Sequence, residues 1–305
     1  MYDIIQKRDY CMGVSFLLIL CVLFWSGNFI IGRYVAFDID PLQLAMFRWL
    51  GASILILPIL LKSYSKILHN IKKHFLILNT LAILGITIFN TFLYIGLQYT
   101  TSTNALLINS FVPVLILVLS YLILKIDINK KQFTGIVLST FGVIFLISKA
   151  KLSNLLNLHI NIGDFWVIGS SFAWALYSVL VRFKPKDLND FEFFTTIVYI
   201  GLFWLALVYF GMGYSLINDI VLVKTYYRVF IYISLFTSVL SYYFWHQGIK
   251  QLGANKTGQF THLMPIFGAI LAYIFLGETL SFYHLIGALF IATGIYLSLF
   301  SPTHR

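Results

Sequence analysis

The chain has 305 residues, of which 60% are hydrophobic and only 10% charged, and its formal net charge is +10. Soluble domains carry roughly 25% charged residues, so this composition excludes an ordinary soluble protein. The Lys and Arg residues lie between apolar runs instead of gathering on one water-exposed face, which excludes a basic groove for nucleic acid.

The first apolar run, 13–33, follows Lys7 and Arg8 and is long enough to span a membrane. Since no small-residue cleavage site follows it, we expect this run to be retained as a helix and not removed as a signal peptide. Cys11 and Cys21 match no metal or redox spacing, so we interpret both as packing residues. We expect neither a metal nor a cofactor.

Apolar runs of about 20 residues, separated by charged or turn-rich breaks, predict ten membrane-spanning helices. They are expected at 13–33, 41–61, 75–97, 103–125, 131–148, 163–183, 191–211, 228–250, 256–276 and 283–301. The chain is therefore predicted to be an all-α integral membrane protein.

The distribution of positive charge predicts the orientation of these spans. With the N-terminus inside, fifteen Lys and Arg residues fall in cytoplasmic segments, five fall outside, and Arg48 is left within a span. Cytoplasmic loops carry the excess of Lys and Arg, so both termini are predicted to be cytoplasmic, in an inner membrane. The alternation also favours a count of ten, because losing one span would scramble it.

The second half of the chain, 153–305, repeats the first half, 1–152. A constant offset of 152 brings identical residues together without a gap, and near the front of each half an offset of 149 pairs Trp25 with Trp174. Each half holds five spans, an odd number, so the second copy enters the membrane from the opposite side. We therefore expect two inverted five-helix repeats, an architecture that recurs in secondary transporters.

Repeated glycines and prolines predict where helices approach closely and where they bend. Gly135 and Gly142 are seven residues apart, as are Gly287 and Gly294, and each pair shares a helix face on which small residues allow close packing. The matching prolines are expected to be hinges that let each half rock, or else fixed kinks; these are Pro113 and Pro265.

Arg48 is the one basic residue well inside a predicted span. It lies seven residues into its helix, roughly 10 Å from the outer end. Two interpretations remain open. Its side chain either reaches the interface or caps carbonyls of a neighbouring helix, or it attracts a carboxylate or phosphate of a substrate.

Polar stripes mark the expected central path. Asn90, Tyr94 and Gln98 recur every four residues and share a helix face. At offset 152 their counterparts Tyr242, His246 and Lys250 are polar too, and two such stripes are incompatible with lipid contact. The remaining candidates for the cavity wall are Trp25, Asn28, Asn104, Asn109, Trp174, Tyr177, Gln259 and His262. Any one of them is alternatively a hydrogen-bonding contact between helices.

No Asp or Glu lies well inside any predicted span, which limits the mechanism. Proton-driven transporters often use such a carboxylate as a relay. Coupling to protons would have to run through His246 or His262, the only mid-span groups that titrate near neutrality. Without that coupling, the chain would be a uniporter or an exchanger.

Several motifs, in order and spacing, resemble those of a known family. Residues 24–29 read FWSGNF, and Arg48 follows Pro41 by seven residues at the start of the second span. Late in the second half, residues 276–278 read LGE, after Pro265 and before the paired glycines; the first half has KID there instead, at 125–127. With these motifs the chain resembles the EamA-like ten-helix exporters of the drug/metabolite transporter superfamily.

The resemblance implies a basket of helices around a central cavity, lined mainly by spans 1, 3, 4, 6, 8 and 9. Members of the family are similar to exporters of amino acids, drugs and other metabolites, with some importers among them. Our leading hypothesis is a secondary transporter, more specifically an exporter, of a small metabolite such as an amino acid or a related amphipathic compound, working by alternating access. We expect a monomer whose partners are the substrate and membrane lipid. A membrane-embedded enzyme or sensor is the alternative; product formation without solute flux would favour the enzyme.

Overall fold

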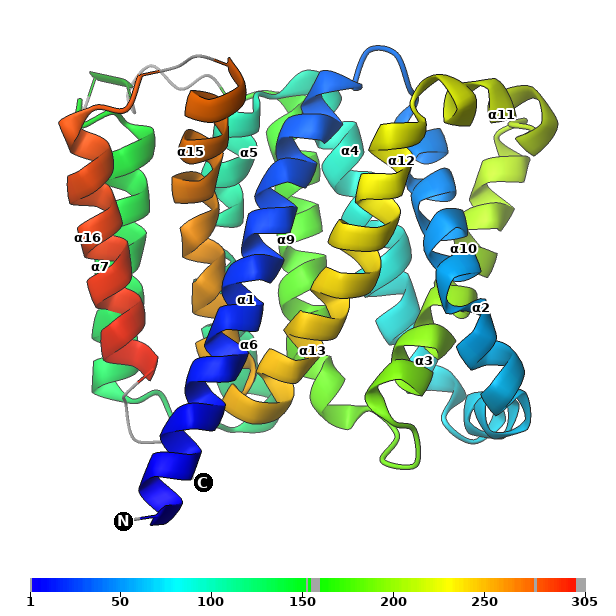
Figure 1. The fold of residues 1–305 in the computed structure, drawn as a ribbon, viewed down its shortest axis with the longest axis horizontal. Helices are drawn as coiled ribbons and strands as arrows, with labels where there is room; N and C mark the ends of the chain where they lie inside the picture. The colour runs from blue at the N-terminus through cyan, green and yellow to red at the C-terminus, as the bar shows by residue number, and fades with distance from the viewer. Residues whose placement is uncertain (1, 152, 155–159, 277–278, 300–305) are drawn as a thin grey trace.

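The computed structural model describes residues 2–151, 153–154, 160–276 and 279–299, with the backbone alone for 2–12, 272, 275 and 276. Throughout these ranges the regular structure is helical, and the helices stand side by side as a bundle (Figure 1). Gly277 and Glu278 of the LGE motif, and the side chains of Leu276 and Cys11, lie outside the described part.

Nine helical stretches in the described part are long and apolar enough to cross a membrane. Six consist mainly of one helix each: α1 (Tyr2–Tyr34), α2 (Pro41–Lys73), α7 (Lys130–Ile147), α9 (Ile162–Leu180), α10 (Asp190–Gly211) and α16 (Phe282–Leu299). Three are composite: α3 (Phe75–Ala82), η1 (Ile83–Ile88) and α4 (Phe89–Tyr99); α5 (Ser102–Asn109) and α6 (Val112–Leu124); α12 (Tyr227–Ser234), η3 (Leu235–Leu240) and α13 (Ser241–Leu252).

The tenth predicted span, 256–276, falls on three consecutive pieces: α14 (Ala254–Gly258), the 3₁₀ stretch η4 (Gln259–Leu263) and α15 (Met264–Leu276). This segment is not among the nine stretches, so a count of ten remains a prediction. Pro265 is the second residue of α15, and Pro113 is the second residue of α6. Each proline thus lies just after a break in its helix, where the missing N–H costs no α-helical hydrogen bond.

The starts of α2 and α10 are built alike. Asp40 caps α2 and Asn189 caps α10, and each forms a capping box with the residue three positions later, Gln43 or Glu192. The side chain of the cap satisfies backbone N–H groups that the first turn leaves free, which fixes where the helix begins. The two caps are 149 residues apart, the offset that also pairs Trp25 with Trp174.

Two of the composite spans contain a π-helical turn at the same place. η1 begins at Ile83 and η3 at Leu235, 152 residues later. A π turn inserts one residue into an α-helix and is frequently found at functional sites. The offset read from the sequence therefore recurs in the path of the backbone.

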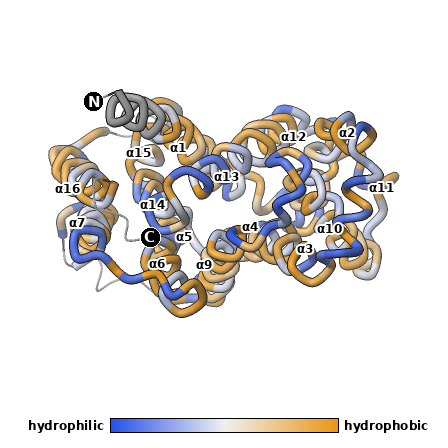
Figure 2. Tube along the Cα trace, turned by 90° about the horizontal axis from the view of Figure 1, so that it is seen from below, coloured by the Kyte–Doolittle hydropathy of each residue, from blue (hydrophilic) through white to orange (hydrophobic). Residues whose placement is uncertain are grey.

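Contacts between helices follow the same symmetry. α4 packs against α9, and α13 packs against α1. Under the two offsets, α4 corresponds to α13 and α1 corresponds to α9. The two contacts are therefore equivalent between the halves. Figure 2 shows the pair of α7 and α16 on one side of the bundle and α2 with α10 on the other.

The paired glycines form the contact between α7 and α16. A methyl group placed on Gly135 would lie 2.5 Å from the carbonyl oxygen of Gly294, and one placed on Gly142 would lie 2.9 Å from that of Gly287. The two backbones are therefore in direct contact, which only glycine permits. The packing role predicted for these residues is confirmed.

Two helical segments at the ends of the bundle were not predicted. α2 continues to Lys73, twelve residues beyond the expected end of its span, after a break in helical geometry at Ser63. α11 (Leu216–Thr225) lies at the opposite end and buries none of its residues. In Figure 1, α1 begins and α16 ends at the same end of the bundle.

Candidate functional site

A small cavity of about 10 Å³, room for about one water molecule, lies in the interior of the bundle. Its walls come from α1, α2, α4, α5, α9 and the segment of η4 and α15. The lining residues are Trp25, Asn28, Phe29, Arg48, Phe89, Leu93, Asn109, Trp174, Thr261 and Met264. Five of them were singled out in the sequence: Trp25, Asn28, Arg48, Asn109 and Trp174.

Trp25 and Trp174, which the offset of 149 pairs, touch each other in this cavity. Their ring centroids are 5.0 Å apart at 88°, an edge-to-face contact. The ring of Tyr242 packs against both, at 6.2 Å from Trp25 and 5.3 Å from Trp174. The aromatic wall of the cavity is thus built from equivalent residues of the two halves, which meet at the centre.

Arg48 lies on the same cavity and is buried, with 1% of its surface exposed. Its guanidinium donates to Ser238 Oγ at 2.7 Å, Thr237 O at 3.1 Å, and, through one nitrogen, Tyr94 Oη at 2.8 Å and Asn28 Oδ1 at 3.4 Å. The interpretation in which Arg48 caps a carbonyl of a neighbouring helix therefore describes part of what it does, since Thr237 lies in the π turn η3.

The charge of Arg48 has no acidic partner within the described part of the chain. All four ion pairs found there involve lysines, and the acceptors around Arg48 are neutral. A buried cation is costly unless it is paired or hydrogen-bonded. Arg48 is therefore held by neutral hydrogen-bond acceptors and by the rings of Trp49 and Tyr94, whose centroids lie 5.2 and 5.9 Å from its guanidinium carbon.

Hydrogen bonds beside the cavity repeat in the two halves. Tyr94 donates to Asn28 Oδ1 at 2.8 Å, and the Tyr177 hydroxyl lies 2.6 Å from His246 Nε2. Tyr94 and His246 are 152 residues apart, and Asn28 and Tyr177 are 149 apart, so these two bonds are equivalent. Arg48 joins only the first, because its counterpart at offset 149 is Ile197.

The two polar stripes meet at Asn90 and Tyr242. Asn90 Nδ2 lies 3.3 Å from Tyr242 Oη, and the Tyr242 hydroxyl donates to the carbonyl oxygen of Gly85 at 2.5 Å. Both side chains are fully buried. This contact joins α4 to α13 across the centre of the bundle.

His262 is buried and bonded through both ring nitrogens. Nε2 donates to the carbonyl oxygen of Ser110 at 2.7 Å, and Nδ1 lies 2.7 Å from Ser139 Oγ. It thus ties η4 to the break between α5 and α6 and to α7. On the next wall of the cavity, Asn109 Nδ2 contacts Met264 Sδ at 3.2 Å. Gln259 is buried, and within the described part neither polar atom of its side chain has a hydrogen-bond partner.

The sequence of this chain matches a known protein family. A sequence model described as the EamA-like transporter family matches the chain twice, at residues 12–148 and 161–300. The chain belongs to the EamA-like transporter family. The resemblance read from its motifs is confirmed, and the protein is an integral membrane protein of a transporter family with a helical fold that contains a repeat.

Two relatives of this EamA-like chain match most of its length and are named as transporters. It is 30% identical over 286 residues to an uncharacterized transporter, YyaM, of Bacillus subtilis (strain 168), covering 93% of this chain and 92% of that protein. It is also 30% identical over 291 residues to an uncharacterized transporter of Archaeoglobus fulgidus, covering 92% and 96%. A solved crystal structure of 14% identity has a TM-score of 0.74 over 94% of this chain and 96% of that one, a likeness of fold.

Two predicted site residues of this EamA-like protein lie apart from the central contacts. Gln98 donates to the carbonyl oxygen of Ala36, near the end of α4. Asn104 lies in the first turn of α5, where its backbone N–H is capped by Thr101. Thr237 and Ser238, which bind Arg48, were not predicted from the sequence, although two adjacent hydroxyl side chains inside a predicted span were the available signal.

Proposed function

We propose that this EamA-like protein is a secondary transporter that exports a small metabolite, such as an amino acid or a related amphipathic compound, by alternating access. The observation that carries the proposal is Arg48: a buried cation, without an acidic partner in the described chain, on the wall of a central cavity. Membership of a transporter family indicates transport. The buried Arg48 indicates that the transported molecule carries an anionic group.

The cavity wall suits a molecule with one anionic end and one apolar end. A guanidinium binds carboxylates and phosphates through several N–H groups at once. Trp25 and Trp174 lie on the same wall and offer apolar ring surface for the rest of the molecule. An amino acid or a related compound combines these two features.

Alternating access agrees with the closed cavity and the repeated helices. A space of about 10 Å³ is far too small for a metabolite, so the bundle must open to admit one. The breaks before Pro113 and Pro265 and the π turns η1 and η3 are matching places where helices can bend in either half. Exchanging the shapes of the two halves would expose the cavity first to one side and then to the other.

We propose that the end of the bundle where α1 begins faces the cytoplasm. α16 ends there too, which agrees with both termini lying on one side of the membrane (Figure 1). Lys62, Lys66 and Lys73, on the last part of α2, belong to the positively charged cytoplasmic segments predicted from the sequence.

Solute flux by purified protein in liposomes tests the proposal. Amino acids and their amides form matched probes, because the amide lacks the carboxylate that Arg48 would bind. We expect saturable flux of the acid, reduced at least tenfold by Arg48→Ala, with a smaller loss for the amide. Arg228→Ala is the matched control, since Arg228 is exposed and remote from the cavity lining.

Each outcome of this experiment decides between functions. Equal losses of acid and amide in Arg48→Ala would mean that Arg48 only supports the fold. Absence of flux for a broad metabolite panel, together with chemical conversion of a panel member, would replace the transporter by a membrane-embedded enzyme. Flux should follow an imposed gradient in either direction because alternating access is reversible, and net export then reflects a higher substrate concentration on the cytoplasmic side.

A further inference from the structure

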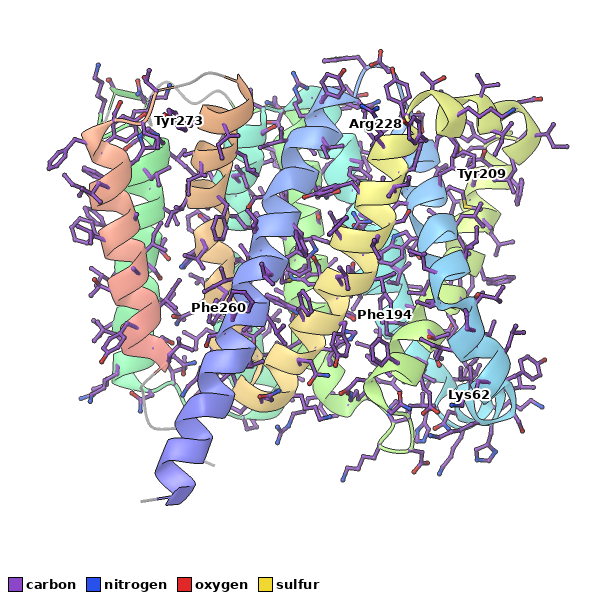
Figure 3. The ribbon with its side chains drawn as sticks, viewed as in Figure 1. Lys62, Phe194, Tyr209, Arg228, Phe260 and Tyr273 are labelled. Carbon is purple, nitrogen blue, oxygen red and sulfur yellow. The ribbon has the colours of Figure 1, made fainter. Side chains whose placement is uncertain are left out.

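A second and larger pocket, of about 620 Å³, lies at the end of the bundle where α1 begins. It is formed by α2 around Lys62, by the start of α10 and by α13, and it shares no lining residue with the central cavity. Figure 3 shows Lys62 on α2 at this end of the bundle, near its edge.

The shape of the pocket follows from a bend in α2. Pro58 removes one backbone hydrogen bond, and Ser63 leaves helical geometry, with φ −112° and ψ 17°. Beyond Ser63 the helix changes direction. In the pocket, the rings of Phe191 and Tyr243 stack at 4.5 Å and 11°, and with Pro58 they give the pocket an apolar wall.

The two carboxylates in the pocket are already neutralised. Glu192 accepts from Lys66 at 2.6 Å and Ser63 at 3.0 Å. Asp190 accepts from Lys250 at 2.8 Å, from Gln247 at 2.9 Å and from Lys184. Three lysines therefore offset two acidic groups before any ligand is present.

A fourth lysine at the pocket has no such partner. Lys62 is exposed and forms no ion pair with any residue that the structure describes. With Lys66, Lys184 and Lys250 it gives the pocket an excess of positive charge over Asp190 and Glu192. The pocket therefore favours an anion, and Lys62 is the lysine free to bind it.

The surface beside Lys62 is apolar and faces outward. Pro58 and Ile59 line the pocket beside Lys62 on α2, and Phe191, which lines it from α10, is 42% exposed. On a chain that spans the membrane, such exposed apolar side chains contact lipid hydrocarbon or its boundary, whereas lysines at helix ends reach the headgroups. Positive charge and apolar surface thus lie next to each other at one pocket.

We propose that this pocket binds an anionic phospholipid, with its phosphate at Lys62 and its hydrocarbon along Pro58 and Ile59. The apolar wall of Phe191 and Tyr243 completes the contact inside the pocket. The site is independent of the transported molecule, because it lies apart from the central cavity. A free phosphate ion would match the charge but would leave the apolar surfaces unoccupied.

Native mass spectrometry of the detergent-purified protein tests the site. Phosphatidylglycerol and phosphatidylcholine with identical acyl chains are offered together, and retained lipid is counted. We expect preferential retention of phosphatidylglycerol, weakened about five-fold by Lys62→Gln, the effect of one lysine near an anionic surface. Lys62→Arg should retain it. Lys72→Gln, a matched exposed lysine on the same helix outside the pocket, should leave retention unchanged.

Three results would overturn the proposal. Equal retention of the two lipids by the wild type would mean that the pocket does not select anions. Equal losses in Lys62→Gln and Lys72→Gln would mean a general attraction to basic surface. Displacement of phosphatidylglycerol by inorganic phosphate at millimolar concentration would mean that the site is a phosphate site and not a lipid site.

Discussion

Gly85 and Thr237, 152 residues apart, each present a backbone carbonyl from a π turn to side chains of the other half. The Tyr242 hydroxyl donates to Gly85 O at 2.5 Å, while Arg48 and Trp25 donate to Thr237 O at 3.1 and 3.0 Å. A π turn leaves carbonyls poorly satisfied along its helix, so side-chain donors are effective there. The two halves are thus hydrogen-bonded to each other at equivalent points. Relative motion of the halves must either break these hydrogen bonds or move each donor together with its acceptor.

Substitution of Gly85 should destabilise the protein. A methyl group there would lie 2.6 Å from the ring of Tyr177, which would have to move and lose its bond to His246. We expect Gly85→Ala to cost about 1–3 kcal/mol, measured by thermal unfolding in detergent. Gly211→Ala, where nothing lies within 4 Å, is the control. Equal melting temperatures of the two variants would contradict the tight packing at η1.

The glycine contact between α7 and α16 should respond in a non-additive way. A methyl group on Gly294 would lie 2.4 Å from Gly135 O, and one on Gly135 would lie 2.5 Å from Gly294 O. Either substitution by alanine forces the backbones apart, at a cost of about 1–3 kcal/mol. Once the helices have separated, the second substitution should cost much less than the first. Fully additive losses in thermal unfolding would mean that the two sites relax independently.

Removal of the Tyr94 hydroxyl should weaken the hydrogen bonding of Arg48 and so destabilise the protein. That hydroxyl accepts from Arg48 and donates to Asn28. Because a hydrogen bond to a charged group contributes about 1.5–3 kcal/mol, Tyr94→Phe should destabilise by an amount in that range. Tyr99→Phe, at the exposed end of the same helix, is the matched control. The prediction fails if both variants unfold at the wild-type temperature.

The bond between Tyr177 and His246 should be weaker than its counterpart in the first half. A double-mutant cycle with Tyr177→Phe and His246→Asn is expected to give a coupling near 0.6 kcal/mol, the average for side-chain bonds between membrane helices. The equivalent cycle with Tyr94→Phe and Asn28→Ala should give a larger value, because Arg48 participates there. Equal couplings would show that the charge of Arg48 adds nothing to the contact.

Much of the fold follows from hydropathy and caps. The predicted span 191–211 coincides with α10 to within one residue, because an apolar run begins at the capping box of Asn189. The tail of α2 and the whole of α11 escaped prediction, since neither is an apolar run of about 20 residues. The π turns escaped too, because inserting one residue leaves hydropathy unchanged.

The sequence predicts candidate residues for the cavity wall, five of which line the cavity of the structure, but not the contacts among them. The offset of 152 indicates that Tyr94 and His246 are equivalent, yet it contains no information about which helix faces them. Their partners Asn28 and Tyr177 are set by the packing of α4 against α1 and of α13 against α9. Arg48 was recognised from the cost of burying a charge, whereas its acceptor in η3 depends on a π turn that hydropathy does not reveal.

Because Arg48 has no acidic partner in the described chain, the effect of membrane voltage on the bundle depends on whether the central cavity holds an anion. With the cavity empty, the middle of the protein carries one positive charge that no acid in the described chain cancels. A substrate with a net charge of −1 bound there would make the same region neutral, whereas a zwitterionic amino acid would leave its net charge at +1. A membrane voltage acts on a charge that crosses its full field with about 2.3 kcal/mol per 100 mV. For a monoanionic substrate, voltage would therefore act differently on the vacant and the loaded forms, and a step that moves Arg48 through the field without the substrate would be the electrogenic one.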